Sequence, residues 1–184
     1  KAFTPLTLKD RKHVTHNTDL FIFALKDKDA HLNLPVSSYI VTKYKGEDGK
    51  DVIRPYTPIN HNEPGELHLL VKTYPRGLMS KHIHQLKVGD QLEIKGPLPK
   101  FDYHANQKKD VAFVVGGTGI TPCLQVLEAI LENPQDKTNV SIVFANTSTA
   151  DILLKDRIDA AAASRKNVKV TYVIDKPEPG FHGE

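Results

Sequence analysis

The stretch "DVAFVVGGTGITPCLQVLEAILEN", residues 110–133, marks the point where the pattern of the sequence changes from short strands to alternating strands and helices. An apolar run that predicts a buried strand leads straight into a glycine-rich turn, and apolar residues then recur at helical spacing. From here on we predict three strands and two helices, at 110–115, 122–133, 139–146, 150–164 and 167–175. Strands and helices that alternate in this order predict a parallel α/β sheet with right-handed crossovers.

The chain before this point has the pattern of an all-β domain. From Phe3 to about Tyr103, short strands are separated by turn segments such as "KGEDGK" and "NEPGE", which favours a closed antiparallel β-barrel. The clearest strand predictions lie at 20–25, 38–44, 66–74 and 91–96. A short helix is predicted at 80–86, after the turn at Gly77.

These patterns predict two lobes, residues 1–105 and 106–184. A nucleotide-binding sheet of the second kind usually has about five or six strands, whereas this lobe has three predicted strands. We therefore expect the second domain to be incomplete at its C-terminus.

Composition excludes several classes of protein. With 39% hydrophobic and 26% charged residues, the 184-residue chain has ordinary globular composition, and its longest apolar run is too short for a bilayer. The formal net charge of +3 comes from dispersed residues, which argues against nucleic acid as a partner. The single cysteine, Cys123, rules out an internal disulfide and a multi-cysteine metal site, so we predict no metal and expect Cys123 to be a packing residue.

The glycine turn "VVGGTGITP", Val114 to Pro122, is the first candidate binding site. Glycines between a strand and a helix let backbone amides approach a phosphate, and the helix N-terminus adds partial positive charge. Pro122 fits the first helical turn. The same pattern also suits a tight turn with a purely structural role, and it is not a full G-x-G-x-x-G because Pro122 occupies the third glycine position.

Two segments of the first lobe are further candidates. In "RPYTP", residues 54–58, two prolines stiffen the backbone around Arg54, Tyr56 and Thr57, which offer a phosphate-binding fork, a stacking face and a hydroxyl. In "PRGLMSKHI", residues 75–83, Gly77 permits a turn and Ser80 is expected to cap the following helix, whose free amides could bind an anion. A surface edge strand and a plain capped helix are the alternative interpretations.

The order of the motifs is more specific than any one of them. "RPYTP", "VKTYPRGLMS", "KGPLPKF", "GGTGITP", "FANTSTADILL" and "VTYVIDKP" follow one another as in the ferredoxin-NADP reductase superfamily, and among its members the chain resembles NADH-dependent cytochrome b5 reductases. The segments "VSS" (36–38) and "GPLPK" (96–100) are similar to fungal and mitochondrial-type members. The cysteine-glycine-proline-proline motif of that family does not occur in this sequence.

The resemblance implies FAD and NADH as cofactors, with roles for particular residues. Thr57 would hydrogen-bond near the reacting flavin nitrogen, as the one catalytic position, and the glycine turn would bind the nicotinamide cofactor. Asp175 would accept from the ribose 2′-hydroxyl and repel a 2′-phosphate, so NADH is favoured over NADPH. The implied cofactor-binding residues are Arg54, Pro55, Tyr56, Thr57, Leu70, Lys72, Tyr74, Gly77, Met79, Ser80, Gly116, Gly117, Thr118, Gly119, Thr121, Pro122 and Asp175.

The function implied by the resemblance is hydride transfer from NADH to FAD and then single-electron transfer to cytochrome b5 or a similar acidic haem protein. Lys43, Lys45, Lys72 and Lys100 are candidates for steering that partner. Two alternatives stay open. The chain could be the flavin module of a larger enzyme such as nitrate reductase, or a nucleotide-binding module without turnover.

Partners and location are expectations of the same kind. We expect a monomer that faces the cytosol. Because the first residue is Lys1, an N-terminal segment outside this chain could anchor it to the mitochondrial outer membrane or the endoplasmic reticulum.

Overall fold

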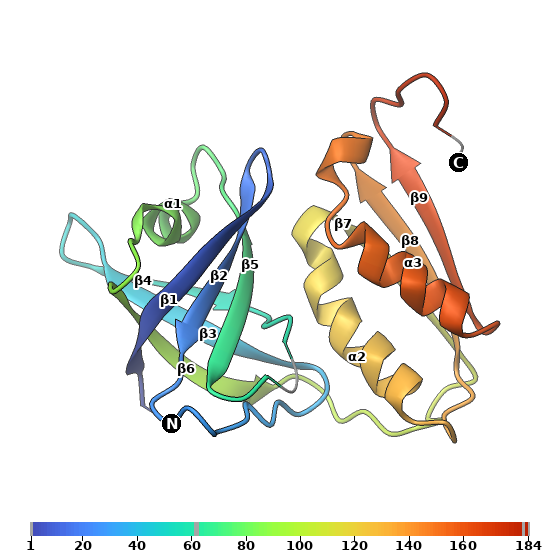
Figure 1. The fold of residues 1–184 in the computed structure, drawn as a ribbon, viewed down its shortest axis with the longest axis horizontal. Coiled ribbons are helices and arrows are strands. Elements are labelled where there is room, and N and C mark those ends of the chain that lie inside the picture. The colour runs from blue at the N-terminus through green and yellow to red at the C-terminus, as the bar shows by residue number, and fades with distance from the viewer. Residues whose placement is uncertain (1, 61–62, 182, 184) are drawn as a thin grey trace. The chain divides into compact units, whose positions relative to one another are not determined.

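The structure, a computed structural model, describes residues 2–60, 63–181 and 183. It forms two compact units, the first ending at Phe101 and the second beginning at Asp102 (Figure 1). The sequence predicted this boundary slightly later, between residues 105 and 106. The connecting segment belongs to the second unit because it bonds to residues of that unit: the Tyr103 hydroxyl donates to Asp136 at 2.6 Å, and the Asn106 side chain donates to the Gln135 carbonyl at 2.9 Å.

The first unit is built around one antiparallel sheet of six strands, rolled so that β1, β2 and β5 lie across from β3, β4 and β6 (Figure 1). The strand order is β4-β3-β6-β1-β2-β5. The predicted barrel-like antiparallel fold is thereby confirmed, and the four predicted strands correspond to β2, β3, β5 and β6. The six strands are β1 (Thr4–Thr15), β2 (Thr18–Ala24), β3 (Ser38–Lys45), β4 (Asp51–Tyr56), β5 (Glu66–Lys72) and β6 (Gln91–Pro99).

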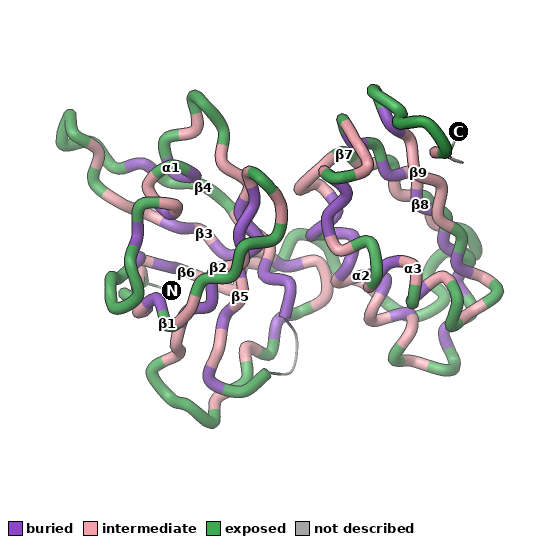
Figure 2. Tube along the Cα trace, turned by 45° about the horizontal axis from the view of Figure 1, so that its top comes forward, coloured by how far each residue is buried: buried purple, intermediate pink, exposed green. Residues whose placement is uncertain are grey.

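One helix, α1 (Leu78–Gln85), contributes to the core of this unit. Its Met79 and Ile83 are almost fully buried and pack with the inward side chains of the strands. Figure 2 shows that buried positions gather on the strands, while the connecting loops are mostly exposed. The helix begins two residues before the predicted start, and its N-cap is Gly77, so the prediction that Ser80 caps it was wrong. Ser80 is the third residue of the helix, and its hydroxyl bonds instead to the backbone of Tyr74 and Gly77 in the preceding turn.

The second unit is a three-stranded parallel sheet in the order β7-β8-β9, with both longer helices on one face (Figure 1). The predicted parallel α/β arrangement is confirmed. The elements are β7 (Asp110–Gly116), the short 3-10 helix η1 (Gly117–Gly119), α2 (Ile120–Glu132), β8 (Asn139–Asn146), the 3-10 helix η2 (Thr149–Asp151), α3 (Lys155–Ser164) and β9 (Val168–Ile174).

The strand predicted at 110–115 is confirmed as β7, but the prediction that it is buried was wrong. Exposed and half-buried residues alternate along β7, and the Val114 side chain is 80% exposed. In a strand, successive side chains point to opposite faces. Since α2 and α3 cover only one face of this sheet, every second residue of β7 faces outward.

The prediction of one helix over residues 150–164 was also wrong in its first part. The chain forms η2, then an extended residue at Ile152 and a left-handed residue at Leu154, whose φ is 55°, before α3 begins at Lys155. Ile152 and Leu153 are both buried. Their burial requires the chain to leave the helical path, which overrides the helical propensity of the segment.

The lone cysteine is a packing residue, as predicted. Cys123 is 5% exposed, burial raises the pKa of its thiol to about 11, and the thiol donates to the Gly119 carbonyl at 3.6 Å. Within the described part of the chain, no helix is long and apolar enough to cross a membrane. The described residues also contain no group of three or more His, Cys, Asp or Glu side chains placed to hold a metal ion.

Candidate functional site

The end of β4 presents three of the predicted cofactor-binding residues in a row. Arg54 and Pro55 are exposed and Tyr56 is half-buried. In the pairing with β3, Arg54 lies opposite Thr42 and Tyr56 opposite Ile40, and the Thr42 hydroxyl donates to the Arg54 carbonyl at 3.1 Å. This pairing fixes the backbone, so the guanidinium and the phenol ring are carried by a rigid edge rather than by a loose loop.

Tyr56 lies near two other predicted residues. Burial raises the pKa of the Tyr56 phenol to about 12, the nearby Arg54 cation opposes that rise, and Tyr74 adds to it. Tyr56 is therefore neutral at physiological pH, with an aromatic face and a hydroxyl available to a ligand. The three side chains bring a cation and two rings together, and Tyr74 is 46% exposed.

Strand β5 supplies the predicted residues Leu70 and Lys72. Leu69 and Val71 belong to the barrel core, so Leu70 and Lys72 point to the other face of the strand. Leu70 is nonetheless only 4% exposed, whereas Lys72 is half-buried. The face of β5 that carries the predicted site residues is thus apolar at Leu70 and cationic at Lys72.

The start of α1 forms a small hydrogen-bonded turn that needs glycine at Gly77. The Gly77 amide donates to the Tyr74 carbonyl at 3.0 Å, the Tyr74 amide donates to Ser80 Oγ at 3.3 Å, and the Ser80 hydroxyl donates to the Gly77 carbonyl at 3.2 Å. A Cβ on Gly77 would lie 2.3 Å from Ser80 Oγ. Because Met79 is 1% exposed within the core, its backbone amide rather than its side chain is left to bind a ligand.

The other end of α1 is fixed by a buried carboxylate. Asp19, 5% exposed, accepts from Arg11 Nε at 2.6 Å, and Arg11 Nη1 donates to the His84 carbonyl at 2.8 Å. The His84 ring nitrogen Nε2 lies 2.9 Å from the Val71 carbonyl. Burial by itself raises the pKa of Asp19, but hydrogen bonds from Arg11 and His13 outweigh it and hold the pKa below its usual value. The charged Asp19 therefore anchors the helix to β1 and β2.

The residues of this first site fit FAD by their chemistry. Helix α1 packs against β3, β4 and β5, so its first-turn amides, which have no partners within a helix, belong to the same region as Arg54 and Tyr56. Amides at a helix start and a guanidinium suit a pyrophosphate. The faces of Tyr56 and Tyr74 suit a flat ring system, and Thr57, half-buried directly after β4, adds a hydroxyl.

The second site is the turn between β7 and α2. Gly117 is left-handed with a φ of 50°, and a Cβ there would meet nothing within 4 Å. At Gly116 and Gly119 a Cβ would meet one atom each, at 3.7 Å. The turn therefore leaves open space beside its backbone amides, at the N-terminal end of a 13-residue helix. This geometry fits the pyrophosphate of a dinucleotide.

The other predicted residues of this turn have different environments. Pro122 lies in the first turn of α2, as predicted, and is exposed. Thr118 is half-buried, and its carbonyl accepts from the Thr121 hydroxyl at 3.1 Å. Thr121 is 7% exposed, so its hydroxyl stabilises the turn. The roles of all three in cofactor binding stay predictions.

Asp175 is exposed at the end of β9, where a carboxylate can meet a ribose. Its amide donates to the Asn146 carbonyl at 3.1 Å and the Lys176 amide donates to the Thr147 carbonyl at 2.9 Å, so the ends of β8 and β9 lie side by side. Asn146, which the sequence analysis did not select, is 7% exposed. Its two side-chain polar atoms find no hydrogen-bond partner among the described residues. A polar residue ending a buried strand was the available signal.

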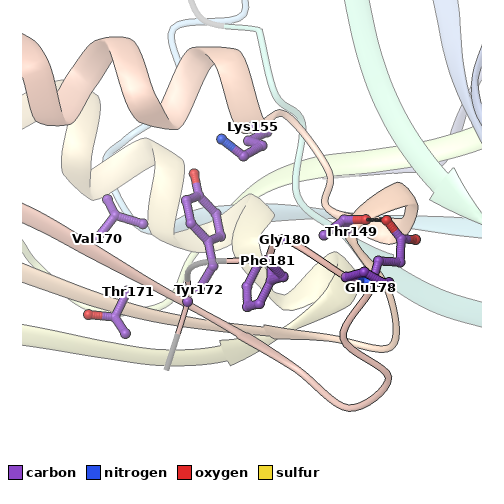
Figure 3. Close-up of a pocket in the computed structure, with 10 residues that line it drawn as sticks. Thr149, Lys155, Val170, Thr171, Tyr172, Glu178, Gly180 and Phe181 are labelled. Carbon is purple, nitrogen blue, oxygen red and sulfur yellow. Dashed lines mark hydrogen bonds between the residues drawn. The ribbon is translucent and has the colours of Figure 1, made fainter.

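A pocket of about 640 Å³ lies beside β9 and the loop after it (Figure 3). The rings of Tyr172 and Phe181 and the ammonium of Lys155 line it. At its rim, the Thr149 hydroxyl donates to Glu178 at 2.7 Å and ties the loop after β8 to the loop after β9. Aromatic faces with a few polar groups are typical of pockets for planar ligands such as nucleotide bases.

Comparison with known proteins also divides the chain into two domains. Residues 5–103 match the family model described as the oxidoreductase FAD-binding domain, and residues 113–184 match the oxidoreductase NAD-binding domain. These matches place the Arg54 site in the first domain and the glycine turn in the second.

Three individual proteins resemble the chain over nearly all of it. An NADH-cytochrome b5 reductase 2 from Yarrowia lipolytica is 45% identical over 181 residues, which cover 97% of this chain and 62% of the relative. An NADH-cytochrome b5 reductase-like protein from Arabidopsis thaliana is 47% identical over 182 residues, 96% of this chain and 55% of the relative. The cytochrome b5 reductase domain of Ulva prolifera nitrate reductase superposes with a TM-score of 0.89 at 33% identity, covering 99% and 77% of the two chains. The chain spans less than two thirds of the length of the first two relatives.

Proposed function

The chain belongs to the cytochrome b5 reductase family of FAD- and NAD-binding oxidoreductases, and on this premise we propose that it transfers electrons from NADH through FAD to a haem protein such as cytochrome b5. The observation that carries the proposal is the presence of one open anion site in each domain. The first combines Arg54 with the start of α1, and the second is the turn from Gly116 to Gly119.

The residues of the first domain would hold FAD. Arg54 and the first amides of α1 would bind the pyrophosphate, and Tyr56 would pack along the flavin ring. Thr57 would donate its hydroxyl near the reacting nitrogen. When bound, FAD supplies the chemistry, because it accepts a hydride and gives up electrons one at a time. The protein contributes orientation, and its rigid strands β4 and β5 keep that orientation fixed.

The residues of the second domain would hold NADH. The amides of the glycine turn would bind the pyrophosphate, and Asp175 would accept from the ribose hydroxyls. A 2′-phosphate at the same place would meet the Asp175 carboxylate and be repelled. No side chain of this chain needs to act as acid or base in this scheme.

The surface charges narrow the choice of residues that steer an acidic partner. Lys43 lies 3.2 Å from Glu93, and Lys45 lies 3.3 Å from Asp51. A paired lysine contributes little net field at a distance. We therefore assign steering to Lys72 and Lys100, and we expect the rate of haem-protein reduction to fall as salt is added.

An anaerobic titration with NADH tests the proposal. The FAD-loaded protein, in a form that includes any further residues its gene encodes, should lose its flavin absorption as NADH is added. Reoxidation by cytochrome b5 should follow. Flavin bands that persist under excess NADH would refute the proposal and favour a nucleotide-binding module without turnover.

A second candidate is the reductase module of a larger enzyme, which the match to the Ulva prolifera nitrate reductase domain favours. The coding sequence upstream of residue 1 distinguishes the two. A haem or molybdenum domain encoded there would support the module, and its absence would leave the separate reductase.

A further inference from the structure

The two end strands of the six-stranded sheet, β4 and β5, are bridged by the segment that follows β4. The Ile59 amide donates to the His68 carbonyl at 3.0 Å. The Asn60 side chain then makes two bonds to the backbone of β5: its Nδ2 donates to the Glu66 carbonyl at 3.0 Å, and its Oδ1 accepts from the His68 amide at 2.8 Å. We call these four residues the closure seam.

Asn60 is suited to this bridge by its chemistry and by its burial. It is 4% exposed, and a carboxamide offers a donor and an acceptor side by side, as a peptide group does. Its side chain therefore replaces the backbone pairing that β4 and β5 do not make with each other. Among side chains of this length, aspartate lacks the donor and leucine lacks both groups.

We propose that Asn60 is a positioning residue for FAD: by closing the barrel it holds Thr57 and the two strands that line the flavin site in their binding geometry before FAD arrives. This inference rests on the proposed function, since it assumes that the site binds FAD. It assigns Asn60 no contact with the cofactor. Asn60 acts through the backbone on either side of it.

Thr57 is held from both directions by this arrangement. Tyr56, just before it, pairs with Ile40 of β3. Ile59, two residues after it, is bonded to His68 of β5. The seam thus leaves only Thr57 and Pro58 to span the gap between two fixed strands, so the direction of the Thr57 hydroxyl depends on the seam.

The same bonds fix the side of the proposed flavin site that β5 forms, opposite the side formed by β4. His68 lies on the face of β5 that also carries Leu70 and Lys72, because side chains alternate along a strand. The start of β5 has its own support, since Glu66 accepts from Lys9 at 2.6 Å and lies 2.7 Å from the His68 ring. A shift at the seam would therefore move the Leu70 and Lys72 wall relative to the Arg54 and Tyr56 wall.

A binding site that is already ordered before the ligand arrives lowers the entropic cost of binding. Without the seam bonds, residues 57–60 sample more conformations in the apo-protein, and FAD has to order them. Removing the seam bonds should therefore weaken FAD binding by more than the accompanying loss of stability explains.

The decisive experiment measures FAD binding to apo-protein by quenching of flavin fluorescence. In Asn60→Ala we expect the FAD dissociation constant to rise about tenfold or more. The control is a variant of equal melting temperature whose change lies in the barrel core, such as Leu6→Ala on β1, which is 8% exposed and outside the seam. Its dissociation constant should change by less than about threefold. Equal changes in the two variants would overturn the inference.

A second variant keeps the test decisive if Asn60→Ala does not fold. Asn60→Asp retains an acceptor for the His68 amide, but its carboxylate faces the Glu66 carbonyl and has no proton to donate. Burial and the facing Glu66 carbonyl raise the pKa of the introduced carboxyl above its ordinary value, so protonation restores the donor as the pH falls, and FAD affinity relative to wild type should improve from about pH 8 to about pH 5. A ratio that does not vary with pH would contradict the proposal.

Hydrogen exchange supplies a readout that does not involve FAD chemistry. The amides of Ile59 and His68 should lose protection in Asn60→Ala, the Ile59 amide alone should lose it in Asn60→Asp, and both should keep it in Leu6→Ala. Wild-type protein that binds no FAD would refute the proposed function. Wild-type protein that binds FAD, with variants that bind it equally well, would refute only the role of Asn60.

Discussion

Replacing Gly77 by alanine tests the turn that leads into the predicted pyrophosphate site. The backbone at Gly77 has φ −82° and ψ 101°, which any residue can adopt, so the substitution introduces no backbone strain. The added Cβ would lie 2.3 Å from Ser80 Oγ and 3.2 Å from Tyr74 Cβ. The Ser80 hydroxyl must therefore move away, and both of its hydrogen bonds are lost.

The expected magnitude follows from these contacts. The two bonds of the Ser80 hydroxyl are long, at 3.3 and 3.2 Å, and each should contribute about 0.5–1 kcal/mol. Crowding against Tyr74 adds about 1 kcal/mol. Alanine also restricts the unfolded chain, which returns about 0.4–1 kcal/mol. We therefore expect Gly77→Ala to lower the free energy of unfolding by about 1–2.5 kcal/mol.

A double-mutant cycle with Ser80→Ala isolates the contact. Without the hydroxyl, the Cβ at position 77 no longer meets Oγ, so Gly77→Ala should become nearly neutral in the Ser80→Ala background. The coupling energy, from urea unfolding of the apo-proteins, should be about 1 kcal/mol or more. Two effects that add within about 0.3 kcal/mol would refute this account of the turn. Both single variants should also weaken FAD binding, because they disturb the start of α1.

Three further predictions concern charge. Asp175→Thr should narrow the preference for NADH over NADPH, measured as the ratio of the two kcat/KM values; an unchanged ratio would remove Asp175 from cofactor selection. Burial raises the pKa of Asp136, but hydrogen bonds from Tyr103 and Thr138 outweigh this effect and leave the pKa lowered. The ionised Asp136 therefore stabilises the fold above about pH 3.9, the pKa of aspartate in an unfolded chain, and this stabilisation is lost as the pH falls further. Asp136→Asn should therefore weaken the decrease of the unfolding free energy at acid pH. Burial lowers the pKa of His82, so His82 should contribute a fall in stability as the pH drops below about 6.5, and His82→Phe should reduce that fall in thermal unfolding scans.

Periodicity alone predicted the bounds of the elements that bury a continuous stripe of apolar side chains. The strand predicted at 139–146 is β8 with the same bounds, and the helix predicted at 122–133 is α2 shifted by two residues at its start and one at its end. β8 is the middle strand of its sheet, and seven residues of α2 are buried. For such elements the local pattern and the tertiary environment agree, so the sequence is sufficient.

Features that depend on burial by distant neighbours were not predicted correctly, although the strand β7 itself was. The apolar run of β7 has the composition of a strand covered on both faces, yet α2 and α3 cover only one of them, and Val114 is 80% exposed. At 152–154 the chain leaves the helical path because Ile152 and Leu153 are buried. Nothing local in either segment distinguishes it from the structure that was predicted.

The candidate site divides in the same way, and the division explains Pro58, the second proline of "RPYTP". Arg54, Tyr56 and Thr57 were predicted as site residues through the order of motifs along the chain. Asn60 was not predicted, because its partners are backbone atoms of Glu66 and His68, which carry no sequence signal. Pro58 is buried and lies between Thr57 and the seam. Proline fixes φ at its own position and restricts the residue before it, so it limits Thr57 directly. Pro58 therefore restricts the conformations of the two residues between β4 and the seam, but it cannot attach them to β5. The Asn60 side chain makes that attachment, so a stiff segment and a buried amide are both required to hold one hydroxyl in place.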